Sequence, residues 1–218
     1  MSRSKAQKML EVLRRSFALP EWLTANMDPF ETLIITIISQ NTTDRNTKRA
    51  FENLSGKFHI TPEALANAEV EEIERCLKPA GLYRNKAKVI KEVSRIVLEK
   101  YNGSLNSILE KPFEESRRML MELPGVGPKT ADVILLFSGG KPTIPVDTHV
   151  KRVSKRLGLA PENGGYEDVR KALQSLFNAG DYLDTHILLI SLGRKYCRAR
   201  NPHCGECPLR ILCPSRSC

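Results

Sequence analysis

The sequence has no long hydrophobic run and few aromatic residues. Aromatic side chains make up 6% of the 218 residues, and one of them is a tryptophan. The longest apolar runs, at 133–137 and 187–190, are far shorter than the ~18 residues of a membrane-spanning helix. The first seven residues are polar, and no apolar segment of a signal peptide follows them. We therefore expect neither a membrane protein nor a secreted one, and a cytoplasmic location.

The chain is nevertheless apolar enough to fold. Hydrophobic residues make up 41% of it, which excludes a disordered chain, and its length suits one large domain or two small ones. Asp28-Pro29, Thr61-Pro62 and Lys111-Pro112 are each typical of a helix start, with the proline as first helical residue. Apolar residues recur three or four apart at 71–77, 86–99, 114–121 and 169–177. The β-branched run at 33–38 is ambiguous, but the preceding cap favours a buried helix. The sequence thus predicts an all-α protein with many short helices.

Positive charge is concentrated near the end of the chain. The formal net charge is +9, and residues 190–218 hold six basic residues against a single acidic one. Basic surfaces often serve only solubility, but this concentration favours a polyanionic partner such as nucleic acid.

Four of the six cysteines lie within 17 residues: Cys197, Cys204, Cys207 and Cys213. In a reducing compartment such a cluster indicates a metal site rather than disulfides. Four thiolates suit either a 4Fe–4S cluster or an all-cysteine zinc site. The uneven spacing of 6, 2 and 5 residues differs from paired zinc-ribbon halves and favours iron–sulfur.

Residues 123–130, Leu-Pro-Gly-Val-Gly-Pro-Lys-Thr, form the sharpest motif. Two glycines around one valine predict a tight turn between two helices, and Pro128 fits the first position of the second helix. The amides of such a turn suit a phosphate oxygen. We interpret the segment as a helix–hairpin–helix that grips a nucleic-acid backbone; the alternative is a plain connection in a helical bundle.

Two residues are candidates for chemistry. Lys129 lies in the first turn of the second helix, where the helix dipole disfavours an ammonium and favours the neutral amine that a nucleophile requires; a solvated charge or a phosphate contact is the simpler alternative. Asp147, in Pro-Val-Asp-Thr-His, is predicted to cap the helix that follows. A capping carboxylate stays ionised and so could accept a proton or stabilise a developing cation.

With these motifs the chain resembles endonuclease III, in the helix–hairpin–helix DNA glycosylase superfamily. The resemblance runs from Pro29 to Cys213 and rests on residues 123–131, Val-Asp-Thr-His at 146–149, and the four cysteines. It implies two helical domains flanking a DNA-binding cleft, a six-helix domain at 22–141 and a second domain of 1–21 plus 142–218. It also implies a 4Fe–4S cluster loop at 197–213.

The resemblance further implies an activity on damaged DNA. Lys129 would attack C1′ of an extruded nucleotide as its base leaves, and Asp147 would stabilise the cationic sugar. The resulting Schiff base would allow β-elimination of the strand. Expected substrates are oxidised pyrimidines of the thymine glycol type, and the expected partner is double-stranded DNA with damaged bases or abasic sites. The enzyme is expected to be a monomer associated with the nucleoid.

Ten residues are expected to contact DNA. Residues 81–87 resemble the family's wedge loop, with Leu82 as the wedge, although an ordinary packing leucine is an equal alternative. Asn41 falls where the family often has a glutamine that fills the base gap, and Gln40 stands one residue earlier. The full set is Asn41, Gln40, Leu82, Arg84, Lys86, Gly125, Gly127, Thr130, Arg194 and Arg198.

Two alternatives stay open. A monofunctional relative, acting on mismatched bases, uracil or adenine, shares the hairpin and often the cluster but lacks the lysine. A non-catalytic DNA-binding module would need neither Lys129 nor Asp147. Trp22 and Cys76 are expected to be packing residues, and Cys218 a free thiol in the tail.

Overall fold

The computed structural model describes residues 1–19 and 28–216, and every regular element in them is a helix. Trp22, Cys218 and the expected domain boundary near residue 22 lie outside the described residues. None of the described helices has the length and apolar character needed to cross a membrane. The chain divides into two compact units, residues 26–141 and residues 1–25 with 142–218.

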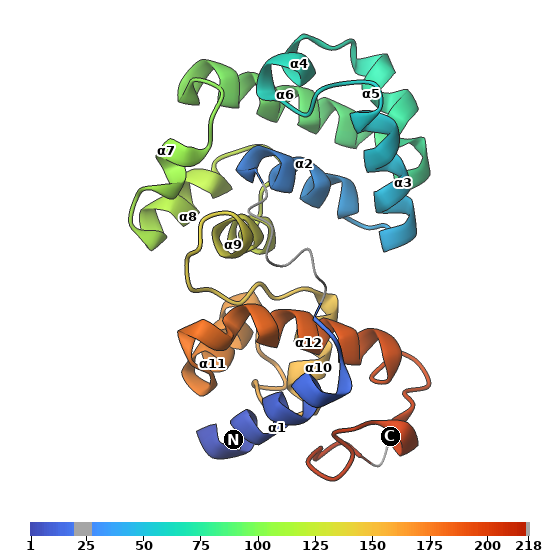
Figure 1. The fold of residues 1–218 in the computed structure, drawn as a ribbon, viewed down its shortest axis with the longest axis vertical. Coiled ribbons are helices and arrows are strands. Elements are labelled where there is room, and N and C mark those ends of the chain that lie inside the picture. Colours follow the sequence, from blue (N-terminus) through green and yellow to red (C-terminus); the bar gives the residue numbers. More distant parts are fainter. Residues whose placement is uncertain (20–27, 217–218) are drawn as a thin grey trace. The chain divides into compact units, whose positions relative to one another are not determined.

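The unit of residues 26–141 contains eight α-helices and a short 3-10 helix among its described residues (Figure 1). Their bounds are α2 Pro29–Ser39, α3 Asp44–Ser55, α4 Pro62–Asn67, α5 Val70–Leu77, η2 Lys78–Ala80, α6 Tyr83–Tyr101, α7 Asn106–Leu109, α8 Phe113–Met121 and α9 Pro128–Phe137.

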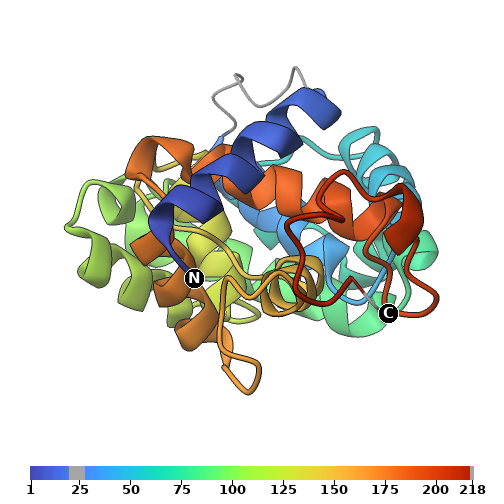
Figure 2. The ribbon, with the colours of Figure 1, turned by 90° about the horizontal axis from the view of Figure 1, so that it is seen from below.

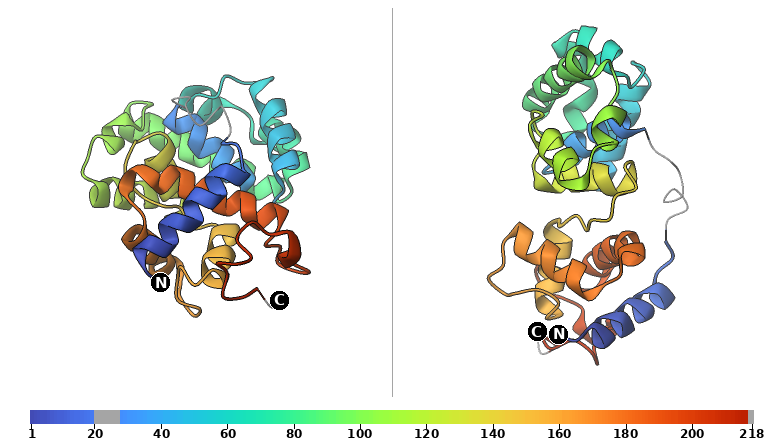
Figure 3. Two further views of the ribbon diagram at one scale, coloured as in Figure 1. Left: turned by 60° about the horizontal axis from the view of Figure 1, so that its bottom comes forward. Right: turned by 90° about the vertical axis from the view of Figure 1, so that its left-hand side faces the viewer.

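One hydrophobic core holds this unit together. Side chains from most of its helices are buried in it, including Ile34, Leu54, Ile90 and Ile134, each with no exposed surface. The long helix α6 packs against α4 and α5, and α2 packs against α9 (Figures 1 and 3). The ambiguous run at 33–38 lies inside α2, so the helix prediction is confirmed. Cys76 belongs to this core, as expected for a packing residue.

The other unit combines the N-terminal helix with the C-terminal half of the chain. Its elements are α1 Arg3–Ser16, α10 Thr148–Arg156, α11 Tyr166–Leu176, η3 Ala179–Asp181, α12 Tyr182–Lys195 and η4 Cys204–Glu206. Helix α12 packs against α10, and α1 lies across α12 (Figure 2). Arg14 of α1 pairs with Asp181 and Asp184 at 2.7 Å each, which joins the first helix to residues 167 or more positions away.

The helix starts follow the capping signals closely. Asp28 accepts hydrogen bonds from the amides of Phe30 and Glu31, and Thr61 accepts one from Ala64. In both helices the proline stands at the first position, as predicted. The prediction for Pro112 is wrong by one residue: Pro112 has an extended ψ of 152° and caps α8, which begins at Phe113.

Candidate functional site

The predicted hairpin joins α8 and α9. Gly125 has a φ of +77°, and a Cβ there would lie 2.5 Å from Cγ1 of Val89, so both its conformation and its close packing require glycine. A Cβ at Gly127 would meet nothing within 4 Å, so this N-cap position faces open space. Pro128 is the first residue of α9. The hairpin thus presents a helix N-terminus with room for an anion beside it.

Lys129 follows Pro128 in the first turn of α9 and is partly buried. The side chain of Thr130 is buried, 3% exposed, so any contact of Thr130 with a phosphate would have to use its backbone amide. The carbonyl of Gly127 accepts the amide of Ala131 at 3.0 Å, which fixes the cap to the helix. The amine is therefore carried on a rigid helix start directly after the turn.

A buried ion pair joins the two helices of the hairpin. Arg117 on α8 donates to both carboxylate oxygens of Asp132 on α9, at 2.8 and 3.4 Å. The Asp132 side chain has no exposed surface and that of Arg117 is 11% exposed. Removing one member of such a pair leaves the other charged and buried.

We therefore expect Asp132→Ala to lower the free energy of unfolding by about 3 kcal/mol. Urea denaturation followed by circular dichroism measures this loss. The double variant Arg117→Met, Asp132→Leu removes both charges and should recover most of it. An Asp132→Ala variant as stable as the wild type would show that the pair does not hold the hairpin.

Gln40, Asn41 and Leu82 lie in the same unit as the hairpin. Gln40 Nε2 donates to the carbonyl of Gly125 at 3.0 Å, so this side chain connects the end of α2 to the hairpin. Asn41 and Leu82 are exposed and have positive φ values of 54° and 48°. The Leu82 side chain is 63% exposed, which excludes the alternative of a leucine packed in the core.

The two basic residues after Leu82 differ from each other. Arg84 is exposed, with its guanidinium 5.8 Å from the centre of the Tyr83 ring. The prediction that Lys86 contacts DNA is wrong. Lys86 is 4% exposed, and its ammonium donates to the carbonyls of Ile38 and Ala80 at 2.8 and 3.0 Å. A side chain held in this way is not available to a DNA phosphate.

Asp147 lies in the other unit and caps α10 as predicted. Its Oδ1 accepts the amide of Val150 at 2.7 Å. The two residues before it are also held: His186 Nδ1 donates to the Pro145 carbonyl at 2.9 Å, and the amide of Val146 donates to the Tyr166 hydroxyl at 3.3 Å. One hydrogen bond thus holds the carboxylate itself, and two others hold the backbone immediately before it.

Helix α10 connects Asp147 to the cysteine loop. Arg152 donates to the carbonyls of Cys197 and Gly193 at 2.9 and 3.0 Å and to Nδ1 of His149 at 3.1 Å. Burial lowers the pKa of His149, so the ring is neutral at pH 7. A Cβ on Gly193 would lie 3.0 Å from this ring, so α12 approaches α10 closely at that point.

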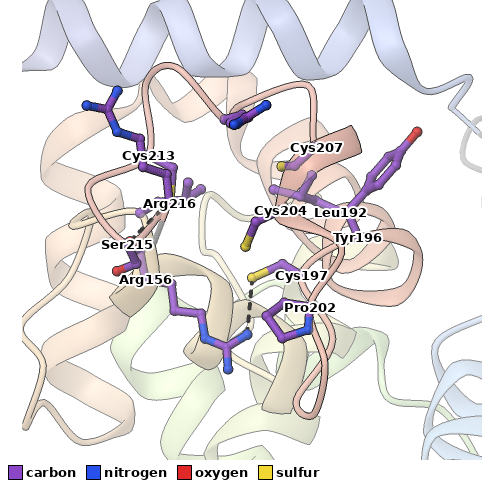
Figure 4. A pocket seen from close by; sticks show the side chains of 12 residues that line it. Arg156, Leu192, Tyr196, Cys197, Pro202, Cys204, Cys207, Cys213, Ser215 and Arg216 are labelled. Carbon is purple, nitrogen blue, oxygen red and sulfur yellow. Dashed lines mark hydrogen bonds between the residues drawn. The ribbon is translucent and has the colours of Figure 1, made fainter. Parts of the chain in front are cut away.

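The four clustered cysteines line one cavity (Figure 4). They come from the loop that follows α12, and Arg156 of α10 enters the cavity wall. Its Nη1 donates to Sγ of Cys197 at 3.5 Å and to the carbonyl of Arg198 at 2.7 Å. Arg194, in the last turn of α12, and Arg198, in the loop that follows it, are both exposed. Arg152 and Arg156 stand in the basic segment Lys151–Arg156, whose sequence does not indicate these contacts.

The chemistry of this cavity fits an iron–sulfur cluster. Burial raises the pKa of the Cys207 thiol, and negative charge on Cys197, Cys213 and Cys204 raises it further. A bound metal centre deprotonates thiols that coordinate it, so four cysteines lining one cavity are a donor set suited to such a centre. Among the described residues no three His, Cys, Asp or Glu side chains converge enough to hold a single metal ion. A zinc ion would need four sulfurs at ~2.3 Å from one point. Four cysteines lining one cavity are the number and type of ligand that a 4Fe–4S cluster takes.

Comparison with known proteins places these sites in a family. Residues 34–179 match the HhH-GPD superfamily of base excision DNA repair proteins, and residues 197–213 match the iron–sulfur binding domain of endonuclease III. Endonuclease III of Bacillus subtilis is 37% identical over 204 residues, covering 94% of this chain and 89% of that protein. Endonuclease III of Escherichia coli K12 is 37% identical over 213 residues, covering 98% and 96%.

Solved structures agree with this assignment. A trapped covalent intermediate of endonuclease III with DNA, an estranged-adenine complex, superposes with a TM-score of 0.87 at 34% identity, covering 100% of this chain and 98% of that one. A non-covalent endonuclease III–DNA complex gives 0.86 at 34% identity, covering 100% and 97%. The fold is that of a helix–hairpin–helix base excision repair protein. Within that class, the chain belongs to the endonuclease III family of DNA glycosylase/lyase enzymes, and its cofactor is a 4Fe–4S cluster.

We expect the purified protein to contain about four iron atoms and about four acid-labile sulfides per chain, with Cys197, Cys204, Cys207 and Cys213 as the ligands. Cys204→Ser should lower both contents together, whereas Cys76→Ser, which changes a core cysteine, should leave them unchanged. Elemental analysis and a sulfide assay measure the two contents. A stoichiometric zinc content without sulfide would contradict the assignment.

Proposed function

We propose that this enzyme removes oxidised pyrimidines from double-stranded DNA and then cleaves the strand by β-elimination, with Lys129 as nucleophile and Asp147 as the catalytic carboxylate. The observation that carries the proposal is the position of Lys129 in the first turn of α9, directly after the open N-cap at Gly127. A phosphate held at the hairpin would bring a sugar of the same strand near the amine.

The first step is the exchange of two bonds at C1′. The Lys129 amine forms a bond to C1′ while the N-glycosidic bond breaks, and the base leaves with the electron pair. The nitrogen now bonded to C1′ is positively charged and loses a proton, and the departing base takes up a proton. Positive charge develops on the sugar as this bond breaks, so an ionised carboxylate nearby lowers the barrier. Asp147 is suited to this role because a backbone amide holds it and because its neighbours are fixed by His186 and Tyr166.

The second step opens the sugar and breaks the strand. O4′ leaves C1′ and takes up a proton, which produces an iminium between C1′ and the lysine nitrogen. The iminium acidifies the C2′ proton; its removal expels the 3′ phosphate. Water then releases the enzyme from C1′. No residue of the iron–sulfur loop takes part in these bond changes. The cluster, when bound, would order the loop that follows Arg194 and carries Arg198.

Borohydride treatment during turnover tests the proposal, because hydride reduces the iminium to a stable amine. With a duplex containing thymine glycol, the wild type should release the base, nick the strand and form a covalent adduct. Base release without nicking or adduct would indicate a monofunctional glycosylase. Binding without base release would indicate a DNA-binding module. Either result overturns the proposal.

A further inference from the structure

Lys86 is a buried cation that the proposed reaction does not use. It lies in the first turn of α6, and its ammonium donates to two backbone carbonyls that are 42 residues apart in the sequence, those of Ile38 and Ala80. No carboxylate pairs with it in the part of the chain that the structure describes. Burial lowers the pKa of the amine, and the two hydrogen bonds to carbonyls offset part of the cost of desolvating it.

The two acceptor carbonyls stand at helix ends. Ile38 is the next-to-last residue of α2, and Ala80 is the last residue of η2. Carbonyls in the last turn of a helix lack an intrahelical donor and carry partial negative charge. A lysine ammonium satisfies both groups at once, and in doing so it ties the end of α2 to the start of the loop before α6.

Each carbonyl lies within three residues of an exposed side chain in a left-handed backbone conformation. Asn41 follows Ile38 with a φ of 54°, and Leu82 follows Ala80 with a φ of 48°. Asparagine adopts such a conformation readily, whereas for leucine it is unfavourable and persists only where the surroundings enforce it. Gln40, between Ile38 and Asn41, is tied in turn to the hairpin carbonyl of Gly125.

We propose that Lys86 is a positioning residue that fixes the Leu82 loop relative to Asn41, so that both side chains enter the DNA duplex together and fill the space left by the extruded nucleotide. This inference rests on the proposed function. A rigid pair loses little conformational entropy on insertion into the duplex, whereas two independent loops would each lose it at the moment of binding. Lys86 therefore acts on extrusion of the nucleotide rather than on the bond changes at the sugar.

Lys86→Met tests this role, because methionine keeps a long apolar side chain and removes the donors. Lys88→Met, an exposed lysine on the same helix, is the matched control. Single-turnover base release is measured on two substrates: thymine glycol in a fully paired duplex, and the same lesion in an unpaired bubble. We expect Lys86→Met to slow release on the paired duplex between about ten- and a hundredfold, and to change release from the bubble by less than about twofold. Lys88→Met should match the wild type on both.

Lys86→Gln provides a second variant if Lys86→Met does not fold, and thermal unfolding verifies the fold of each. A fluorescent base next to the lesion reports unstacking, which should slow in parallel with base release. Equal losses on both substrates, or no loss on the paired duplex in a folded variant, would overturn the role of Lys86. A wild type without base release on either substrate would instead overturn the proposed function.

Discussion

We expect Lys129→Ala to form no detectable covalent adduct with DNA and no detectable nicked strand. Its rate of base release should fall by a factor of about 10³ or more. The reason is that the amine forms the bond to C1′, and no other side chain replaces that bond. Quantifying the borohydride adduct and the nicked product on a gel measures the loss. Because Lys129 is partly exposed at a helix start, the substitution should leave the fold and the iron content intact.

Lys100→Ala is the matched control for this variant, since Lys100 is an exposed lysine at the end of α6 in the same unit. It should trap DNA as the wild type does. DNA binding by Lys129→Ala should persist, because the hairpin amides and Gly127 are unchanged. Trapping by Lys129→Ala at the level of the wild type would show that another amine is the nucleophile.

Asp147→Asn should slow base release about 10²- to 10³-fold. The substitution removes the negative charge that opposes the developing positive sugar, but it keeps the shape of the side chain. Asparagine caps helices about as well as aspartate, so the bond to the Val150 amide is retained and stability should change by less than about 0.5 kcal/mol. Single-turnover kinetics on a thymine glycol duplex and urea unfolding provide the two measurements.

Thr61→Ala serves as a control for helix capping as such. Thr61 caps α4, in a part of the chain with no proposed catalytic role, so this variant should lose about 1 kcal/mol of stability and keep its rate of base release. If Asp147→Asn released the base at the rate of the wild type, Asp147 would be a capping residue only.

The helices were predictable because their signals are local. Asp28 and Thr61 each accept hydrogen bonds from amides within four residues, at the start of their own helices. The glycines and Pro128 of the hairpin lie within six residues of one another and define its turn. The spacing of the four cysteines likewise lies within one loop, and these residues line one cavity as a cluster site requires. In each case the interacting groups are close together in the sequence, so a local sequence pattern is enough to predict the interaction.

Long-range contacts could not be predicted in this way. Lys86 was expected on the DNA surface because it lies within residues 81–87, which resemble the wedge loop, and only the folded chain shows that its ammonium meets a carbonyl 48 residues away. Arg156 and Cys197 are 41 residues apart, and nothing in a basic helical stretch indicates which arginine faces a sulfur. The helical period places Arg152 and Arg156 on one face, which suggests a shared partner but does not identify it.

The most direct test of the account is to locate the reduced adduct on the protein. The complex trapped with borohydride on a thymine glycol duplex is digested with nuclease and protease, and mass spectrometry then identifies the peptide that carries the sugar remnant. We predict the added mass on Lys129, in the peptide that follows the hairpin. A remnant on another lysine or on the N-terminal amine would contradict the central claim that the first turn of α9 supplies the nucleophile.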